Sequence, residues 1–234
     1  MISKKRIWVV LAIALCSVAI YITAAKDSKY TTASGSVDER PVIILDAGHG
    51  GEDGGAVGAD GTVEQLLNLQ ITKYLEEQLT VFGIQTVMTR TTEDSIHNPD
   101  AATTRERKVS DIHNRMKIME TTQNAVFVSI HQNKFQSKSE WGTQVFYSPN
   151  TTASAELADC IQQSVIETLQ PENTRVIKKS GSSIYLLYYA KKPAVLVECG
   201  FLSNPSELEK LKDEIYQKKI AFSIALGILE YLNS

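Results

Sequence analysis

Short apolar runs with the character of buried strands alternate along most of this chain with stretches whose apolar residues recur at helical spacing. The runs expected to form strands cover residues 42–45, 84–89, 125–130, 143–147, 184–188 and 194–197. Helices are expected over residues 62–82, 109–119 and 153–169 and again after residue 204. Such alternation is typical of a mostly parallel sheet covered on both faces. The sequence predicts an α/β fold: a single domain with a mostly parallel, twisted sheet flanked by helices on both faces.

Two of the expected helices begin with capping signals. Thr62 and Gln65 have the spacing of a capping box. Asn204, Pro205 and Glu207 match the preferred residues at the N-cap, N1 and N3 positions. These signals place the helix starts near residues 62 and 204.

The N-terminal segment is typical of a membrane or export signal. Residues 7–25 form a 19-residue uncharged run that follows three basic side chains at positions 4–6. A run of that length can span a bilayer as a helix, with its basic flank on the cytoplasmic side. Thr23 and Ala25 are small residues where a signal peptide could be cleaved, but a cleaved signal usually has an apolar region of only about 7–15 residues. An uncleaved transmembrane helix is therefore favoured over a cleaved signal.

This interpretation divides the chain into three parts. Residues 1–26 are expected to be the membrane anchor or signal sequence, residues 27–40 a linker rich in Ser and Thr, and residues 41–234 the folded domain. The folded domain is then membrane-anchored or exported and lies outside the cytoplasmic membrane.

The folded part is acidic. The whole chain has a formal net charge of −3, but after residue 26 there are 20 basic and 27 acidic side chains, a net charge of −7. A nucleic-acid-binding domain normally carries a basic surface. Nucleic acid is therefore excluded as the expected partner.

Cys160 and Cys199 are the cysteines of the exported part. An oxidising compartment would permit a disulfide between them, but two cysteines do not make a disulfide framework and spacing cannot establish contact. Unpaired, buried thiols are the default expectation.

Two histidines and two glutamates are expected to meet at one edge of the sheet. His49 follows the first strand, His131 the third and Glu198 the last, while Glu64 falls in the opening turn of the first helix. Open α/β sheets bind ligands outside the carboxyl ends of their strands. The sequence therefore predicts a functional site at this edge.

This set of side chains has the chemistry of a catalytic zinc site. Two imidazoles and one carboxylate can bind Zn²⁺ and leave the fourth position open for water, and a further carboxylate can act as general base and acid. Each residue alone has an ordinary alternative, such as a hydrogen-bonded structural histidine or a glutamate at a helix N-terminus. The glycine-rich residues 48–55 lack the Gly-Lys-Ser/Thr ending of a phosphate loop, and no H-E-x-x-H peptidase motif is present.

Four ordered motifs resemble a known family. They are IILDAGHGG at residues 43–51 with GGA at 54–56, Glu64 with LNL at 67–69, SIHQN at 129–133, and VECGFLSNP at 197–205. Together they resemble the zinc-dependent N-acetylmuramoyl-L-alanine amidases of the amidase-3 type, across about residues 42–232. The resemblance implies that His49, Glu64 and His131 bind Zn²⁺ and that Glu198 is the catalytic carboxylate.

The resemblance also implies a substrate and a place of action. The family cleaves the amide bond between N-acetylmuramic acid and L-alanine in peptidoglycan. A single anchored domain without wall-binding repeats, and the stretch at residues 104–111, resemble the germination-specific members that act in the spore cortex and allow muramic-δ-lactam to form. Such a protein would contact the membrane through its N-terminal helix and would face the forespore intermembrane space. The sequence does not show whether an accessory protein is needed.

A different class of function remains as an alternative. The chain could be a non-catalytic, zinc-stabilised scaffold that binds peptidoglycan, but such a protein would not need Glu198 beside the metal ligands. Asp46 and Asn133 are candidates for orienting the histidines. Arg90, Arg107 and Arg115 are candidates for binding peptide carboxylates, although structural ion pairs are the commoner role of such side chains.

Overall fold

The computed structural model describes residues 40–234. The expected anchor over residues 1–26 and the linker up to residue 39 lie outside the described residues. Within residues 40–234, no helix is both long and apolar enough to cross a membrane.

Six strands form one sheet in the described part of the chain, in the order β2-β1-β3-β6-β4-β5. Neighbours among the first four strands of that order are parallel, β4 is antiparallel to β6, and β5 is parallel to β4. The sheet is therefore mixed but mostly parallel, and the predicted α/β fold is confirmed. The strands are β1 (Val42–Ala47), β2 (Thr86–Met88), β3 (Ala125–Asn133), β4 (Gln144–Tyr147), β5 (Lys178–Lys179) and β6 (Ala194–Phe201).

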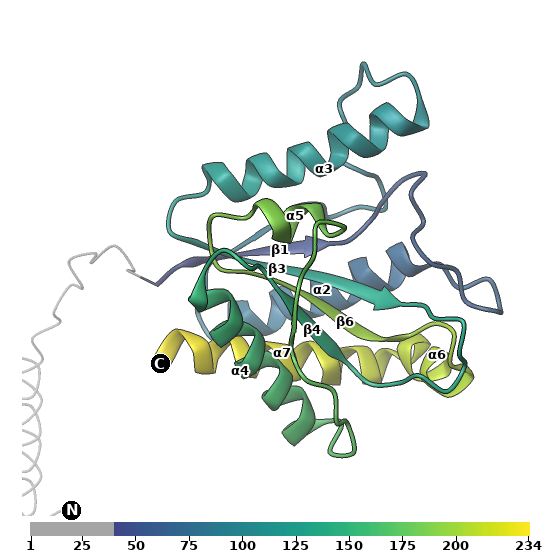
Figure 1. Cartoon of the computed structure of the whole chain (residues 1–234), viewed down its shortest axis with the longest axis vertical. Helices are drawn as coiled ribbons and strands as arrows, with labels where there is room; N and C mark the ends of the chain where they lie inside the picture. The colour runs from purple at the N-terminus through teal and green to yellow at the C-terminus, as the bar shows by residue number, and fades with distance from the viewer. Residues whose placement is uncertain (1–39) are drawn as a thin grey trace, which may run out of the picture. The chain divides into compact units, whose positions relative to one another are not determined.

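Helices cover both faces of this sheet (Figure 1). The long helices α2, α4 and α7 pack on one face, and α3 and α5 pack on the other. The helices are α2 (Glu64–Val81), α3 (Thr104–Thr121), α4 (Thr152–Thr168), α5 (Tyr185–Tyr189), α6 (Pro205–Lys212) and α7 (Glu214–Asn233).

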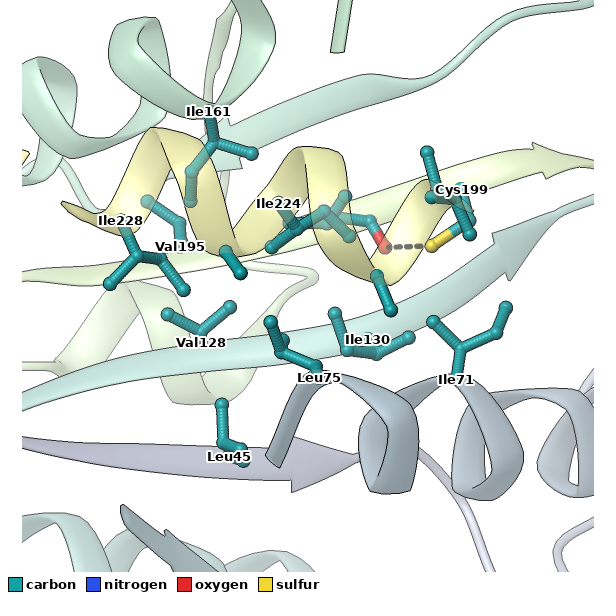
Figure 2. Close-up of a cluster of buried hydrophobic side chains, with 14 of the residues drawn as sticks. Leu45, Ile71, Leu75, Val128, Ile130, Ile161, Val195, Cys199, Ile224 and Ile228 are labelled. Carbon is teal, nitrogen blue, oxygen red and sulfur yellow. Dashed lines mark hydrogen bonds between the residues drawn. The ribbon is translucent and has the colours of Figure 1, made fainter. Parts of the chain in front are cut away.

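Alternate residues of the central strands supply the two apolar cores. Leu45, Val128 and Val195 face the first core, where they meet Leu75 of α2 and Ile224 of α7 (Figure 2). The intervening positions of the same strands face the second core beneath α3 and α5; they include Ile44, Phe127 and Leu196. This alternation follows from the two-residue period of a strand and fixes which side chains reach each face.

Cys160 and Cys199 are free. Cys199 is fully buried in the first core, where its thiol lies 3.9 Å from the carbonyl oxygen of Val197 (Figure 2). Cys160 lies on α4 and is half-buried. The expectation of unpaired thiols is confirmed for both residues, and that of burial for Cys199 but not for Cys160.

The expected strand at residues 184–188 is wrong, because this segment forms the short helix α5. Leu186 and Leu187 are consecutive and both are buried against the same apolar core. Consecutive residues of a strand point to opposite faces, so a strand could not bury both on one side. A helical turn packed flat on the sheet can bury both.

One of the two predicted helix caps is correct. The side chain of Asn204 accepts hydrogen bonds from the backbone N–H groups of Ser206 and Glu207, with Pro205 in the first turn. The predicted Thr62 cap is wrong, because Val63 is the N-cap of α2 and makes no side-chain capping bond. The backbone of α2 begins instead against the preceding loop, where the Glu64 N–H donates to the carbonyl oxygen of Ala56.

Candidate functional site

The structure brings together the residues that the sequence placed at the edge of the sheet. His131 and Glu198 are paired neighbours on β3 and β6, His49 follows β1, and Glu64 opens α2. The ligand atoms of His49, Glu64 and His131 all lie within 4.8 Å of one another. These three side chains form a cluster that could hold a metal ion.

The turn after β1 depends on residues that tolerate unusual backbone angles. His49 has a φ of 64°, and Gly51 has a φ of 58°. Gly48 is required for a different reason, because a Cβ at that position would lie 2.2 Å from Nε2 of His131. The absence of a side chain at Gly48 therefore allows the His131 ring to pack against this turn.

Two buried arginines hold the carbonyl groups of the same turn. Arg90 donates hydrogen bonds to the carbonyl oxygens of Ala47 and Gly48. Arg115 donates to those of Ala47 and His49 and forms a 2.6 Å ion pair with Asp46. The guanidinium groups of both arginines therefore make their contacts inside the fold.

Glu64 lies between the two histidines. Its Oε1 is 3.0 Å from Nδ1 of His131 and 3.3 Å from Nε2 of His49. The carboxylate also accepts hydrogen bonds from the Ala56 and Gln132 backbone N–H groups and from the Asn68 side chain. Burial alone would raise the pKa of Glu64, but the bonds to both histidines hold it far below its usual value. The carboxylate is therefore ionised, as a metal ligand must be.

His49 contacts Asp53, whose Oδ2 lies 3.0 Å from Nδ1 of the ring. Burial would lower the pKa of His49, but hydrogen bonds to Asp53 and Glu64 raise it to about 9. The expected orienting role of Asp46 is wrong, because its carboxylate binds Arg115, Thr89 and Ser129 instead. No hydrogen bond joins the Asn133 side chain to either histidine, so that expectation is wrong too.

Glu198 faces a pocket beside the two histidines. The pocket has a volume of about 310 Å³, and its apolar wall comes mainly from α5 and the strands; its residues include Ile112, Phe127, Ile184, Leu187 and Leu196. Oε2 of Glu198 is buried without a hydrogen-bond partner among the described residues. Burial, reinforced by the nearby Glu64 charge, raises the pKa of Glu198 to about 7 despite the opposing effect of His131. A carboxylate in this state can both accept and return a proton near neutral pH.

The arginines proposed for substrate binding form structural contacts. Arg90 and Arg115 are buried, and Arg107 forms a 2.7 Å ion pair with Glu52. These three arginines therefore have a structural role, which is the commoner one for such side chains.

Sequence reasoning missed Asp53 and Asn68. Asn68 lies four residues after Glu64 and therefore one turn further along the same face of α2, so helical spacing could have found it. Asp53 approaches His49 only because the intervening turn folds back, with reciprocal backbone hydrogen bonds between Gly50 and Asp53. No periodic signal in the sequence indicates that contact.

Comparisons with known proteins agree with this geometry. The amidase-3 family model, described as N-acetylmuramoyl-L-alanine amidase, matches residues 43–230. A germination-specific N-acetylmuramoyl-L-alanine amidase of Bacillus subtilis is 37% identical over 195 residues, which cover 81% of this chain and 79% of that protein.

Solved structures of amidases are also similar. The CwlD amidase of Clostridioides difficile, solved in complex with the GerS lipoprotein, has 40% sequence identity and a TM-score of 0.79, with 82% of this chain and 98% of the other covered. The amidase AmiC2 of Nostoc punctiforme has 28% identity and a TM-score of 0.70, with coverages of 83% and 98%. The chain therefore belongs to the amidase-3 family and is an N-acetylmuramoyl-L-alanine amidase, an enzyme that hydrolyses peptidoglycan.

Proposed function

We propose that this amidase works with Zn²⁺ held by His49, Glu64 and His131, and that Glu198 is its catalytic carboxylate. The observation that carries the proposal is the convergence of two imidazoles and an ionised carboxylate within 4.8 Å, beside a second carboxylate with an unpaired buried oxygen. Two histidines and one glutamate are a ligand set that zinc hydrolases use. The residues present therefore fit the metal.

The reaction can be derived from the residues around the site. When bound, Zn²⁺ supplies Lewis-acid chemistry, which polarises a carbonyl oxygen and makes water more acidic. Glu198 accepts a proton from the water that attacks the lactyl carbonyl carbon of N-acetylmuramic acid. As the new C–O bond forms and the C–N bond breaks, Glu198 returns the proton to the L-alanine nitrogen. Oε2 of Glu198, which has no hydrogen-bond partner among the described residues, is available for both transfers.

His131→Ala should abolish tight zinc binding, since it removes one of three protein ligands. Metal analysis of the purified variant at limiting zinc should show near-complete loss, against one zinc per wild-type chain. His113→Ala is the matched control, because His113 is exposed on α3 and belongs to no metal cluster among the described residues. Full zinc retention by His131→Ala would mean that the metal lies elsewhere.

We further propose that the enzyme acts on spore cortex, where release of the stem peptide allows muramic-δ-lactam to form. The similarity to a germination-specific amidase supports this role. Purified cortex peptidoglycan incubated with the zinc-loaded full chain should yield stem peptides with a free L-alanine amino group, which mass spectrometry detects. Peptidoglycan that is bound but not cleaved, both with and without an accessory lipoprotein, would favour the alternative of a non-catalytic, zinc-stabilised scaffold.

The proposed location is the outer side of the cytoplasmic membrane, facing the forespore intermembrane space, with residues 1–26 as an uncleaved anchor and residues 27–40 as a linker. The uncharged run behind a basic flank supports this arrangement. Intact-mass measurement of the membrane-extracted protein should give the full chain. A mature protein that starts near residue 26 would show cleavage instead.

An accessory lipoprotein on the same membrane surface is part of this proposal. It is supported by the similar CwlD amidase, whose structure is a complex with the GerS lipoprotein. If the isolated full chain binds zinc and cleaves peptidoglycan as fast as it does with the lipoprotein present, no such partner is needed.

A further inference from the structure

The turn that follows His49 brings the carboxylate of Asp53 next to the His49 ring. The backbone N–H groups of Gly50 and Asp53 each donate to the carbonyl oxygen of the other residue, at 3.0 and 3.1 Å. Gly50 and Gly51 both have positive φ values, 140° and 58°, which close the turn tightly. This closure brings the Asp53 side chain back to the His49 ring four residues earlier.

Each oxygen of the Asp53 carboxylate has a separate partner. Oδ2 lies 3.0 Å from Nδ1 of His49, and Oδ1 lies 2.9 Å from Nζ of Lys108 on α3. The lysine therefore holds the carboxylate through the oxygen that does not contact the histidine. A cation near the carboxylate also keeps it in the acceptor-only state that binds an imidazole N–H.

We infer that Asp53, held by Lys108, is the positioning residue that orients His49 for metal binding. With its Nδ1 proton donated to Asp53, His49 loses only its Nε2 proton on metal binding, so its lone pair lies on Nε2, the ring nitrogen that faces Glu64. A carboxylate behind a metal-binding histidine fixes both the tautomer and the ring orientation and makes the ligand more basic. The inference rests on the proposed metal site and adds two residues to it.

Glu52, the residue before Asp53, provides a control that distinguishes orientation of His49 from simple attachment of the turn to α3. Glu52 and Asp53 both connect the turn to α3, through Arg107 and Lys108 respectively. Glu52 makes no contact with a proposed metal ligand among the described residues; its carboxylate binds Arg107 and Thr104. Loss of Glu52 therefore removes a connection to α3 without touching His49, which makes Glu52→Ala the matched control.

The test is the zinc dissociation constant of the full chain, measured by competition with a chelator. Asp53→Ala should raise this constant by about 10- to 100-fold, the usual effect of removing a partner behind a metal ligand. Asp53→Asn keeps an acceptor oxygen but loses the charge, so its constant should fall between those of Asp53→Ala and the wild type. Glu52→Ala should keep the wild-type constant.

Lys108 is tested through its dependence on Asp53. The pair is partly exposed, so Lys108→Met alone should weaken zinc binding by about two- to fivefold. In the Asp53→Ala background, Lys108→Met should have no further effect, because the lysine acts through the carboxylate. An equal effect in both backgrounds would overturn the role of Lys108.

His49→Ala separates failure of this inference from failure of the proposed function. If His49→Ala loses zinc while Asp53→Ala binds it as the wild type does, the positioning role of Asp53 is wrong and the metal site stands. If His49→Ala itself binds zinc normally, the proposed metal site is wrong and the inference falls with it. If Glu52→Ala weakens binding as much as Asp53→Ala, the turn is merely tethered and the specific role of Asp53 is overturned.

Discussion

Glu198→Gln is expected to lower the rate of amide cleavage by about 10²–10⁴-fold. Glutamine has nearly the shape of glutamate, so packing within β6 should change little. Its amide cannot take a proton from the attacking water or return one to the leaving nitrogen. The measurement is the release of stem peptide from purified peptidoglycan by the zinc-loaded full chain, followed by mass spectrometry.

Zinc content provides the control for this variant. Glu198 is not part of the His49, Glu64 and His131 cluster, so Glu198→Gln should bind zinc as the wild type does. A variant that keeps most of its activity would show that Glu198 is not the base. A variant that loses zinc together with activity would show that Glu198 is a ligand, and the base would then be another residue.

Arg115→Met should lower the free energy of unfolding by about 3–5 kcal/mol, because it leaves the buried carboxylate of Asp46 without its cation. The variant also loses the hydrogen bonds from Arg115 to the carbonyl oxygens of Ala47 and His49. Urea denaturation at pH 7 measures the loss. Arg105→Met is the control: Arg105 is exposed on the same helix, so its replacement should change stability by at most about 0.5 kcal/mol.

The effect of Arg115→Met should depend on pH in a defined direction. Burial would raise the pKa of Asp46, but Arg115, Ser129 and Thr89 hold it below its usual value. The wild type therefore gains stability from this carboxylate above the unfolded-state pKa and loses it as the pH falls through the folded-state pKa. In the variant the pKa should rise, so protonation relieves the unpaired charge. The stability difference between the two proteins should narrow from pH 7 towards pH 4, and a constant difference would contradict the assigned pair.

The central sheet was predictable because its strands are visible in the sequence as apolar runs. The apolar runs at β1, β3 and β6 are nearly continuous, as expected of parallel strands buried on both faces. The segment of α5 carries a similar run, but its packing against the face of the sheet decides its conformation. The two-residue strand β5 is identified only by its pairing with β4, which depends on the rest of the fold.

The candidate site was predictable where strand ends determine position. His49 follows β1 and Glu64 opens the helix after it, while His131 and Glu198 lie on the neighbouring strands β3 and β6, which extend beyond the expected ends at residues 130 and 197. Apart from the contact of Asn68 with Glu64, the contacts behind them were not predictable, because they depend on side chains far apart in the sequence or on turn angles. Asp46 and Arg115 are 69 residues apart, and Asp53 reaches His49 only through a turn closed by glycines.

The alternation along β6 links the register of the sheet to catalysis. Val197 and Cys199 face the apolar core beneath α7, and Glu198 between them faces the pocket. A slip of one residue in the pairing with β3 would exchange these faces, so that a thiol entered the pocket and a carboxylate entered the apolar core. Because a buried, unpaired charge is costly, the misaligned sheet is strongly disfavoured. The register that packs β6 against the core is therefore the same register that places the proposed base in the pocket. An insertion of one residue within β6 would disrupt both the core packing and the position of Glu198.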